Sequence, residues 1–128
     1  MFPDIEQLLV QYLKSVITER VLTDLPSNLD EILPVVRLTR VSGADDDYKL
    51  DRPIVDVDVF AFDRAGAFAL ARRVQALLRF ELPTVTCPGG VVTNVSTIVG
   101  PRWLPDTNTN LRRVQATYEL TAHAPIGA

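Results

Sequence analysis

Residues 51–80 read DRPIVDVDVFAFDRAGAFALARRVQALLRF, a strand pattern followed at once by a helix pattern. From residue 54 to residue 62 the side chains alternate between two faces, which is the period of a pleated β-strand. One face carries Val55, Val57, Val59 and Ala61, and the other carries Ile54, Asp56, Asp58, Phe60 and Phe62. The first face is apolar throughout, so we expect it in the hydrophobic core.

The helix pattern begins after Asp63, whose carboxylate can accept a hydrogen bond from a backbone N–H group left free at a helix start. Apolar residues then recur at spacings of three and four, which places them on one side of a helix. They are Ala67, Leu70, Ala71, Val74, Leu77 and Leu78. The spacing predicts a helix over residues 64–79 that packs on the apolar face of the strand and keeps its arginines in water.

The rest of the chain supplies a second helix and four more strands. Apolar residues at helical spacing, among them Leu8 and Leu9, predict a helix over residues 4–17 that packs on the same sheet. Strand patterns cover residues 20–23, 34–41, 91–99 and 111–122, and turn-forming residues separate them. Short connections favour antiparallel hairpins among the first three strands and between the last two.

These elements predict an α/β (α+β) fold of two layers, a mainly antiparallel sheet with two helices packed on one face. The length of 128 residues is that of one domain, residues 1–128. An apolar fraction of 47% and a charged fraction of 23% are ordinary for a folded globular protein. No apolar run is long enough to span a bilayer, and the acidic N-terminus is unlike a signal peptide, so we expect no membrane segment.

Two connections are candidate partner-contact loops. The first, SGADDDYKLD at residues 42–51, is a solvated hairpin turn without the ligand spacing of a calcium loop. Its candidate contact residues are Asp45, Asp46, Asp47 and Tyr48. The second, GPRWLPDTNTN at residues 100–110, is too polar and too rich in proline for a strand interior. Its candidate contact residues are Arg102, Trp103, Leu104 and Asp106, and Trp103 is either a rigid anchor for a partner or a lid over the domain's own core.

Few residues suggest chemistry. Asp56 and Asp58 share one strand face and can hold a divalent cation if further carboxylates converge there, but plain sheet surface is the more common role of such a pair. The single histidine, His123, and the single cysteine, Cys87, stand outside any pattern of a nucleophile, a disulfide or a metal site. We therefore predict no catalytic residue, no metal and no cofactor. The net charge of −3 argues mildly against a nucleic-acid surface.

Blocks along nearly the whole chain resemble tail terminator (tail completion) proteins of long-tailed bacteriophages. The blocks are IEQLLVQYLK, VLTDLP, PVVRLTRV, GADDDYKLD, PIVDVDVFAFDRAGAFALARRVQALL, GPRWLPDTN and RRVQATYELTAHA, within residues 5–124. None of them is a catalytic motif, so the resemblance rests on their order and on the chain length. It implies a small α/β protein without enzymatic activity that forms a hexameric ring on the head-proximal end of the tail tube. Such a ring stops tube polymerisation and offers a surface to the neck of the capsid.

The resemblance also implies partners and a location. The partners are further copies of the chain, the tail tube protein and a neck or head-completion protein, with DNA passing through the ring without specific binding. The location is the virion, after assembly in the host cytoplasm. Within such a ring, Asp56 and Asp58 are candidates either for the channel lining or for a subunit interface, where Arg37 or Arg113 would pair with them. Two other functions stay open, a neck or head-completion connector and a small metal-dependent phage nuclease that uses Asp56 and Asp58.

Overall fold

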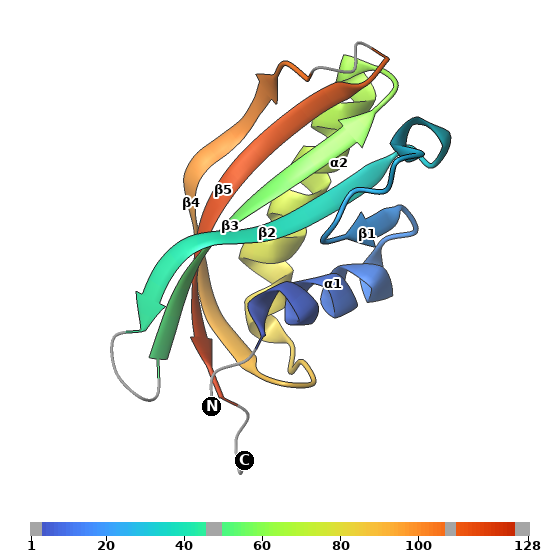
Figure 1. Ribbon diagram of the computed structural model, residues 1–128. Coiled ribbons are helices and arrows are strands. Elements are labelled where there is room, and N and C mark those ends of the chain that lie inside the picture. Colours follow the sequence, from blue (N-terminus) through green and yellow to red (C-terminus); the bar gives the residue numbers. More distant parts are fainter. Residues whose placement is uncertain (1–3, 46–49, 107–109, 125–128) are drawn as a thin grey trace.

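A twisted sheet forms one layer of the molecule and helices form the other (Figure 1). The structure, a computed structural model, describes residues 4–45, 50–106 and 110–124. In these residues five strands lie in the order β1-β2-β3-β5-β4. Their bounds are β1 Arg20–Leu22, β2 Val35–Asp45, β3 Leu50–Ala61, β4 Val91–Leu104 and β5 Arg112–His123. The predicted α+β architecture is confirmed.

The helices α1 (Ile5–Val16) and α2 (Arg64–Ala76) pack on the same face of the sheet. Each begins at a capping aspartate, because Asp4 Oδ1 accepts a hydrogen bond from the Gln7 N–H group at 3.2 Å and Asp63 Oδ1 accepts one from Gly66 at 2.6 Å. After α2 the chain continues through a π-helical turn, Leu77–Glu81, and a 3-10 turn, Leu82–Thr84. The α-helix therefore ends three residues before the predicted limit at residue 79. In the described part of the chain no helix is both long and apolar enough to cross a membrane.

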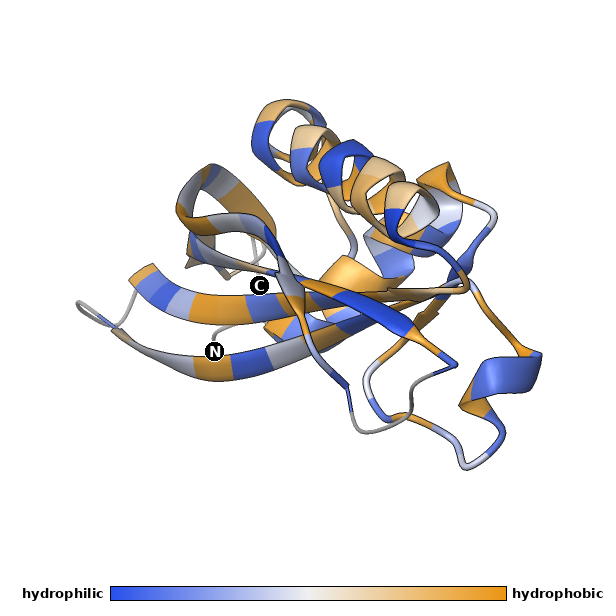
Figure 2. Cartoon of the chain, turned by 90° about the horizontal axis from the view of Figure 1, so that it is seen from above, coloured by the Kyte–Doolittle hydropathy of each residue, from blue (hydrophilic) through white to orange (hydrophobic). Residues whose placement is uncertain are grey.

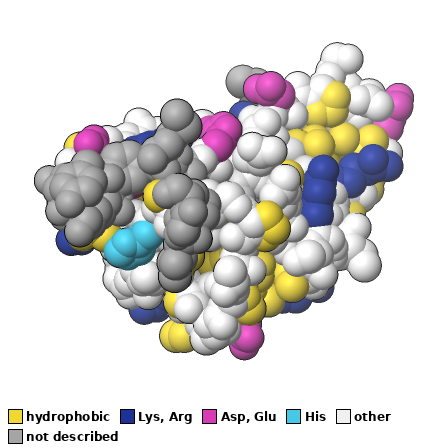
Figure 3. Space-filling model, turned by 90° about the horizontal axis from the view of Figure 1, so that it is seen from below, with side chains coloured by type: hydrophobic (Ala, Val, Ile, Leu, Met, Phe, Trp, Pro, Cys, Tyr) yellow, Lys and Arg dark blue, Asp and Glu magenta, His cyan; other side chains and the backbone are white. Residues whose placement is uncertain are grey.

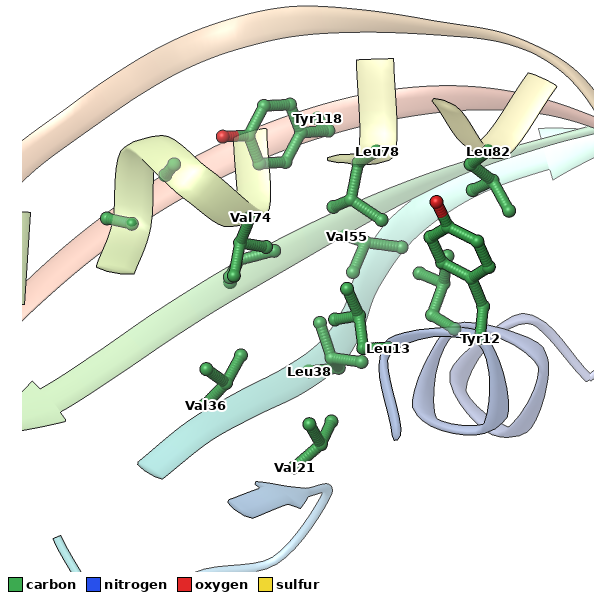
Figure 4. Packing of buried hydrophobic residues seen from close by; sticks show 14 of the residues in the cluster. Tyr12, Leu13, Val21, Val36, Leu38, Val55, Val74, Leu78, Leu82 and Tyr118 are labelled. Carbon is green, nitrogen blue, oxygen red and sulfur yellow. The ribbon is translucent and has the colours of Figure 1, made fainter. Parts of the chain in front are cut away.

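The main core lies between the helices and the sheet (Figure 4). The alternation of apolar and polar residues along the strands, visible in Figure 2, aims one apolar row of each inner strand at the helices. Seven residues that the sequence placed in the core are at most 5% exposed, which confirms the prediction for them. They are Leu8, Leu9, Val55, Val57, Val59, Leu70 and Val74.

The pairing of the first two strands corrects a prediction. β1 and β2 run parallel, with Arg20 opposite Val35 and Leu22 opposite Arg37, whereas the short links had favoured antiparallel hairpins. The connection between β1 and β2 is residues 23–34, which include a 3-10 turn at Leu29–Glu31. It returns the chain to the end of the sheet at which β1 begins, so that β2 starts beside the start of β1. A tight hairpin turn cannot produce a parallel pair, but a connection of this length can. All other strand pairs in the described residues are antiparallel.

The end of β4 corrects a second prediction. Residues 100–104 continue the strand instead of opening a long loop, so Arg102, Trp103 and Leu104 are strand residues, paired with Gln115, Val114 and Arg113. A proline at residue 101 is tolerated because β4 is an edge strand, where one side of the backbone needs no ladder partner. Asp106 follows the strand end, and Asp45 is the last residue of β2. The other acidic-turn candidates, Asp46, Asp47 and Tyr48, lie outside the described residues.

Candidate assembly surfaces

The sheet face opposite the helices carries hydrogen bonds centred on Asp58 of β3. This carboxylate is only 1% exposed. Its Oδ2 accepts two bonds from Arg37 of β2, Nη2 at 2.8 Å and Nε at 3.2 Å. Its Oδ1 accepts one from Arg113 Nε at 2.9 Å and one from Gln115 Nε2 at 3.0 Å, both from β5. Arg102 of β4 extends the row, because its Nη2 donates to Gln115 Oε1 at 3.2 Å.

We call these five residues, Arg37, Asp58, Arg113, Gln115 and Arg102, the Asp58 ladder. It crosses four neighbouring strands, β2, β3, β5 and β4. A buried carboxylate is costly unless charged donors and further hydrogen bonds satisfy it, and both oxygens are satisfied here. The sequence had suggested Arg37 or Arg113 of a neighbouring subunit as partners, whereas the structure supplies both from the same chain. Whether these residues lie at a channel or at a subunit interface stays a prediction.

Asp56, two residues earlier on the same face, is half-buried, and its Oδ1 accepts a hydrogen bond from the Thr117 hydroxyl at 2.6 Å. Since N–H donors occupy both oxygens of Asp58, the pair is not arranged to hold a cation. Among the described residues, no three His, Cys, Asp or Glu side chains gather as a metal site would require. The nuclease hypothesis therefore receives no support from the arrangement of Asp56 and Asp58.

One end of this sheet face is not solvated surface. Phe60 is 1% exposed and forms a second apolar cluster with Leu29, Val35 and Leu111, which residues in the 22–33 segment help to cover. The guanidinium groups of Arg37 and Arg113 lie 5.7 Å and 5.8 Å from the Phe60 ring centroid, a cation–π distance. The sequence had placed Phe60 on an open face, so its burial corrects that expectation. The reason is the β1–β2 connection, which folds over the sheet at this end.

Trp103 lies on the surface rather than over the core. Its ring is 45% exposed and stands on the helix side of the sheet edge, opposite Val114. Arg64, the first residue of α2, lies 5.6 Å from the Trp103 ring and 5.5 Å from the ring of Phe68. Its guanidinium thus contacts both rings, which holds the tryptophan in a defined orientation. A rigid, half-exposed aromatic residue of this kind is enriched at the centres of protein interfaces.

Other large apolar side chains are also exposed. Among them are Phe62 and Phe80 at 64%, Ile98 at 51% and Val41 at 50%. Phe62 lines a cavity of about 490 Å³ at the start of α2, whose rim carries an ion pair between Arg73 and Glu19. Partial burial raises the pKa of Glu19, but the hydrogen bond and charge of Arg73 outweigh it, so the pKa is lowered and the pair stays charged at neutral pH.

Cys87 and His123 lie in unreactive surroundings. Cys87 is half-buried, and burial raises the pKa of its thiol, which keeps it protonated and weakly nucleophilic at neutral pH. His123 ends β5, with its Nε2 3.3 Å from the hydroxyl of Thr93, and it is visible at one end of the molecule in Figure 3. No contact of the described residues brings a base to Cys87, and the Thr93 hydroxyl beside His123 also lies 3.5 Å from the Thr121 carbonyl oxygen, to which it can donate.

Sequence reasoning missed three parts of this arrangement, namely the roles of Gln115 and Arg102 in the ladder and the second apolar cluster. Alternation along β5 did place Gln115 on the polar face. It could not show that Gln115 stands directly opposite Asp58, because that depends on the register between strands distant in sequence. The signal for the cluster was the run of leucines in residues 22–33, which is too apolar for a plain surface loop.

Comparisons with known proteins agree with the fold and identify the family. A model of the phage tail termination protein family matches residues 1–128. A chain from a solved structure entitled "Virion of native gene transfer agent (GTA) particle" has the same fold, with a TM-score of 0.70 over 94% of this chain and 95% of that chain at 15% identity. No curated protein sequence matches. Since the family match covers the whole sequence, the chain belongs to the phage tail termination proteins and is a structural protein of the bacteriophage virion.

Proposed function

We propose that the protein forms a hexameric ring on the head-proximal end of the phage tail tube, where it ends polymerisation and offers its free surface to the neck of the capsid. The observation that carries this proposal is the family match over residues 1–128. The partners are further copies of the chain, the tail tube protein and a neck or head-completion protein. The protein assembles in the host cytoplasm, acts without a cofactor and catalyses no reaction.

The surface of the chain supports a role in assembly. A closed ring needs two different surfaces on each subunit, because every copy contacts its neighbours head to tail. The exposed rings of Phe62 and Trp103 near the start of α2, and of Phe80 beyond its end, supply apolar area for such contacts. Trp103 and Arg102 at the end of β4, together with Asp106 just beyond it, are our candidates for contacts with the tube or the neck. Asp45 at the end of β2 leads into the acidic turn, the other candidate.

We further propose that the sheet face opposite the helices lines the channel. It carries Arg37, Arg52, Arg102 and Arg113 together with Asp56, Asp58 and Glu119. Carboxylates thus accompany the arginines on this face, and Asp58 itself neutralises two of them. A lining whose arginines are paired with carboxylates grips phosphate weakly, since each free Lys or Arg contact adds affinity for DNA. This arrangement suits DNA that passes without specific binding.

The capping function can be tested with purified protein and tail tubes. We expect rings at one end of each tube in electron micrographs, and tubes that no longer elongate when fresh tube protein is added. Rings that bind isolated portal complexes but not tube ends would show instead a neck or head-completion connector. Tubes that elongate normally with the protein present would refute the capping role.

The channel assignment needs a separate test. Asp56→Lys adds positive charge to the polar face and leaves the Asp58 ladder intact. If the face lines the channel, the variant forms normal rings but slows DNA ejection, because the added lysines bind phosphate. If the face contacts a neighbouring subunit, the variant does not form rings. Normal rings with normal DNA ejection would show that Asp56 lies neither in the channel lining nor at a subunit interface.

A further inference from the structure

The edge strand β4 is left open in a way that folded proteins usually avoid. Among the described residues β4 pairs only with β5, so the backbone groups on its outer side have no strand partner. Exposed edges are commonly protected by charged side chains, above all lysine. Residues 92–99, VTNVSTIV, contain no charged residue, and Ile98 is 51% exposed at a bulge between Thr97 and Val99. An edge without charged side chains can pair with another strand.

The opposite edge of the sheet is open over a matching length. β1 covers only Val35, Val36 and Arg37 of β2, so residues 38–45 lack a strand partner on that side within the described chain. Val41 is 50% exposed at a bulge in this part of β2. One backbone group here is capped by a side chain, since Glu6 Oε2 accepts a hydrogen bond from the Arg40 N–H group at 2.7 Å. At this backbone group the second edge is thus held by a side chain and not by a strand.

The two open edges lie at the same level of the sheet. Register connects Thr97 of β4 through Tyr118 and Val55 to Arg40 of β2. Nearer the other end, where β1 covers β2, β4 contains Pro101, which has no N–H group to offer a partner. The unpaired parts of β2 and β4 therefore lie at the same position along the strand direction. The bulges that carry Val41 and Ile98 also lie at the same position along that direction.

The directions of the two strands also match. β2 is antiparallel to β3, β3 to β5 and β5 to β4, so β4 runs antiparallel to β2. Rotation about an axis along the strands preserves these directions. A second copy placed beside the first by such a rotation would present its β2 antiparallel to β4 of the first copy. Antiparallel pairing is the more stable and more frequent arrangement of two strands.

We infer that residues 92–99 of β4 in one copy pair with residues 38–45 of β2 in the next, so that the sheets of neighbouring copies join. This inference rests on the proposed ring and specifies its subunit contact. The contact is head to tail, as ring closure requires, because β4 and β2 are different surfaces. On pairing, the Arg40 N–H group exchanges the Glu6 carboxylate for a backbone carbonyl of the neighbour.

Two lysine substitutions test the pairing. Ile98→Lys puts a charge on the β4 edge, and Val41→Lys puts one on the β2 edge. Both side chains are half exposed in the single chain, so the variants should fold. We expect each to raise the dissociation constant of self-association by about 100-fold or more and to be monomeric by light scattering where the unaltered protein forms rings. The matched control is Val85→Lys, whose side chain is 41% exposed on neither edge and should leave the ring intact.

Mixing the two variants distinguishes a head-to-tail contact from a symmetric one. Ile98→Lys keeps an intact β2 edge and Val41→Lys keeps an intact β4 edge, so the mixture should form one-to-one dimers and nothing larger. Rings formed by either variant alone would refute the edge pairing while leaving the ring itself established. Self-association of Val41→Lys into dimers would show a symmetric β4–β4 contact and refute it too. An unaltered protein that stays monomeric both in solution and on tail tubes would refute the ring and this inference together.

Discussion

Removing the charge of Asp58 should cost more stability than removing that of Asp56, its neighbour on the same sheet face. Asp58→Asn keeps the size of the side chain but turns an acceptor oxygen into an N–H donor that faces a guanidinium group. The side chain of Asp58 is 2% exposed, and those of Arg37 and Arg113 are 24% and 21% exposed. Breaking a fully buried pair costs about 3 to 5 kcal/mol, and because both arginines reach some water we expect about 3 kcal/mol.

That loss is measurable by thermal and urea unfolding followed by circular dichroism. For a chain of 128 residues, about 3 kcal/mol corresponds to a fall in Tm of roughly 10 °C. Asp56→Asn is the matched control, since Asp56 has a single hydrogen bond to Thr117 and should lose less than about 1 kcal/mol. If Asp58→Asn is as stable as Asp56→Asn, the ladder does not stabilise the sheet and our account of its buried charge is wrong.

Four further outcomes follow from the structure. Leu70→Ala should lower the free energy of unfolding by about 2 to 4 kcal/mol, and an unchanged urea midpoint would show that the core is misplaced. Burial raises the pKa of Tyr118 to about 12 and its hydroxyl has no partner in the described residues, so stability should fall as pH rises from about 10 towards 12, where the unfolded tyrosine ionises first. Tyr118→Phe should reduce that pH dependence without loss of stability at pH 7, and the part that remains should include that of Tyr12, whose pKa burial also raises. Gly43 has φ +104°, and an added Cβ would overlap the Arg52 carbonyl oxygen, so Gly43→Ala should disorder the β2–β3 hairpin in amide hydrogen exchange. Cys87→Ser and His123→Ala should still form rings in electron micrographs, and a folded His123→Ala protein unable to assemble would reveal a function there.

The sequence alone was sufficient to predict the helices and strands whose residue pattern is local and regular. The alternation in β3 and the three-and-four spacing in the two helices correctly predicted core residues such as Val57, Leu9 and Leu70, but not the burial of Phe60 on the opposite face. Asp63 fixed the start of α2 for the same reason, since a cap bonds to a residue only three positions away, whereas Asp4, which the sequence placed inside its helix, is the cap of α1. Periodicity works here because one face of each element is uniformly apolar.

The predictions failed where a neighbour distant in sequence decides the outcome. Residues 100–104 looked like a loop because Pro101 and Arg102 suit no strand interior, and only their position at the sheet edge makes a strand tolerable. Asp58 looked like a surface carboxylate because its partners, Arg37 and Arg113, stand 21 and 55 residues away along the chain. Their approach follows from strand order and register, which periodicity does not contain.

The Asp58 ladder also has a consequence for how the sheet folds. If β2 and β3 paired with a shift of two residues, apolar side chains would still face the helices, so apolar burial alone penalises that register weakly. In the shifted register, however, Asp58 would stand opposite Val35 or Thr39 instead of Arg37. Asp58 would then lose both hydrogen bonds from Arg37 and keep only those from Arg113 and Gln115 of β5, so one of its two buried ion pairs would be broken. The buried charge thus favours the correct β2–β3 register over a shift that apolar burial would tolerate.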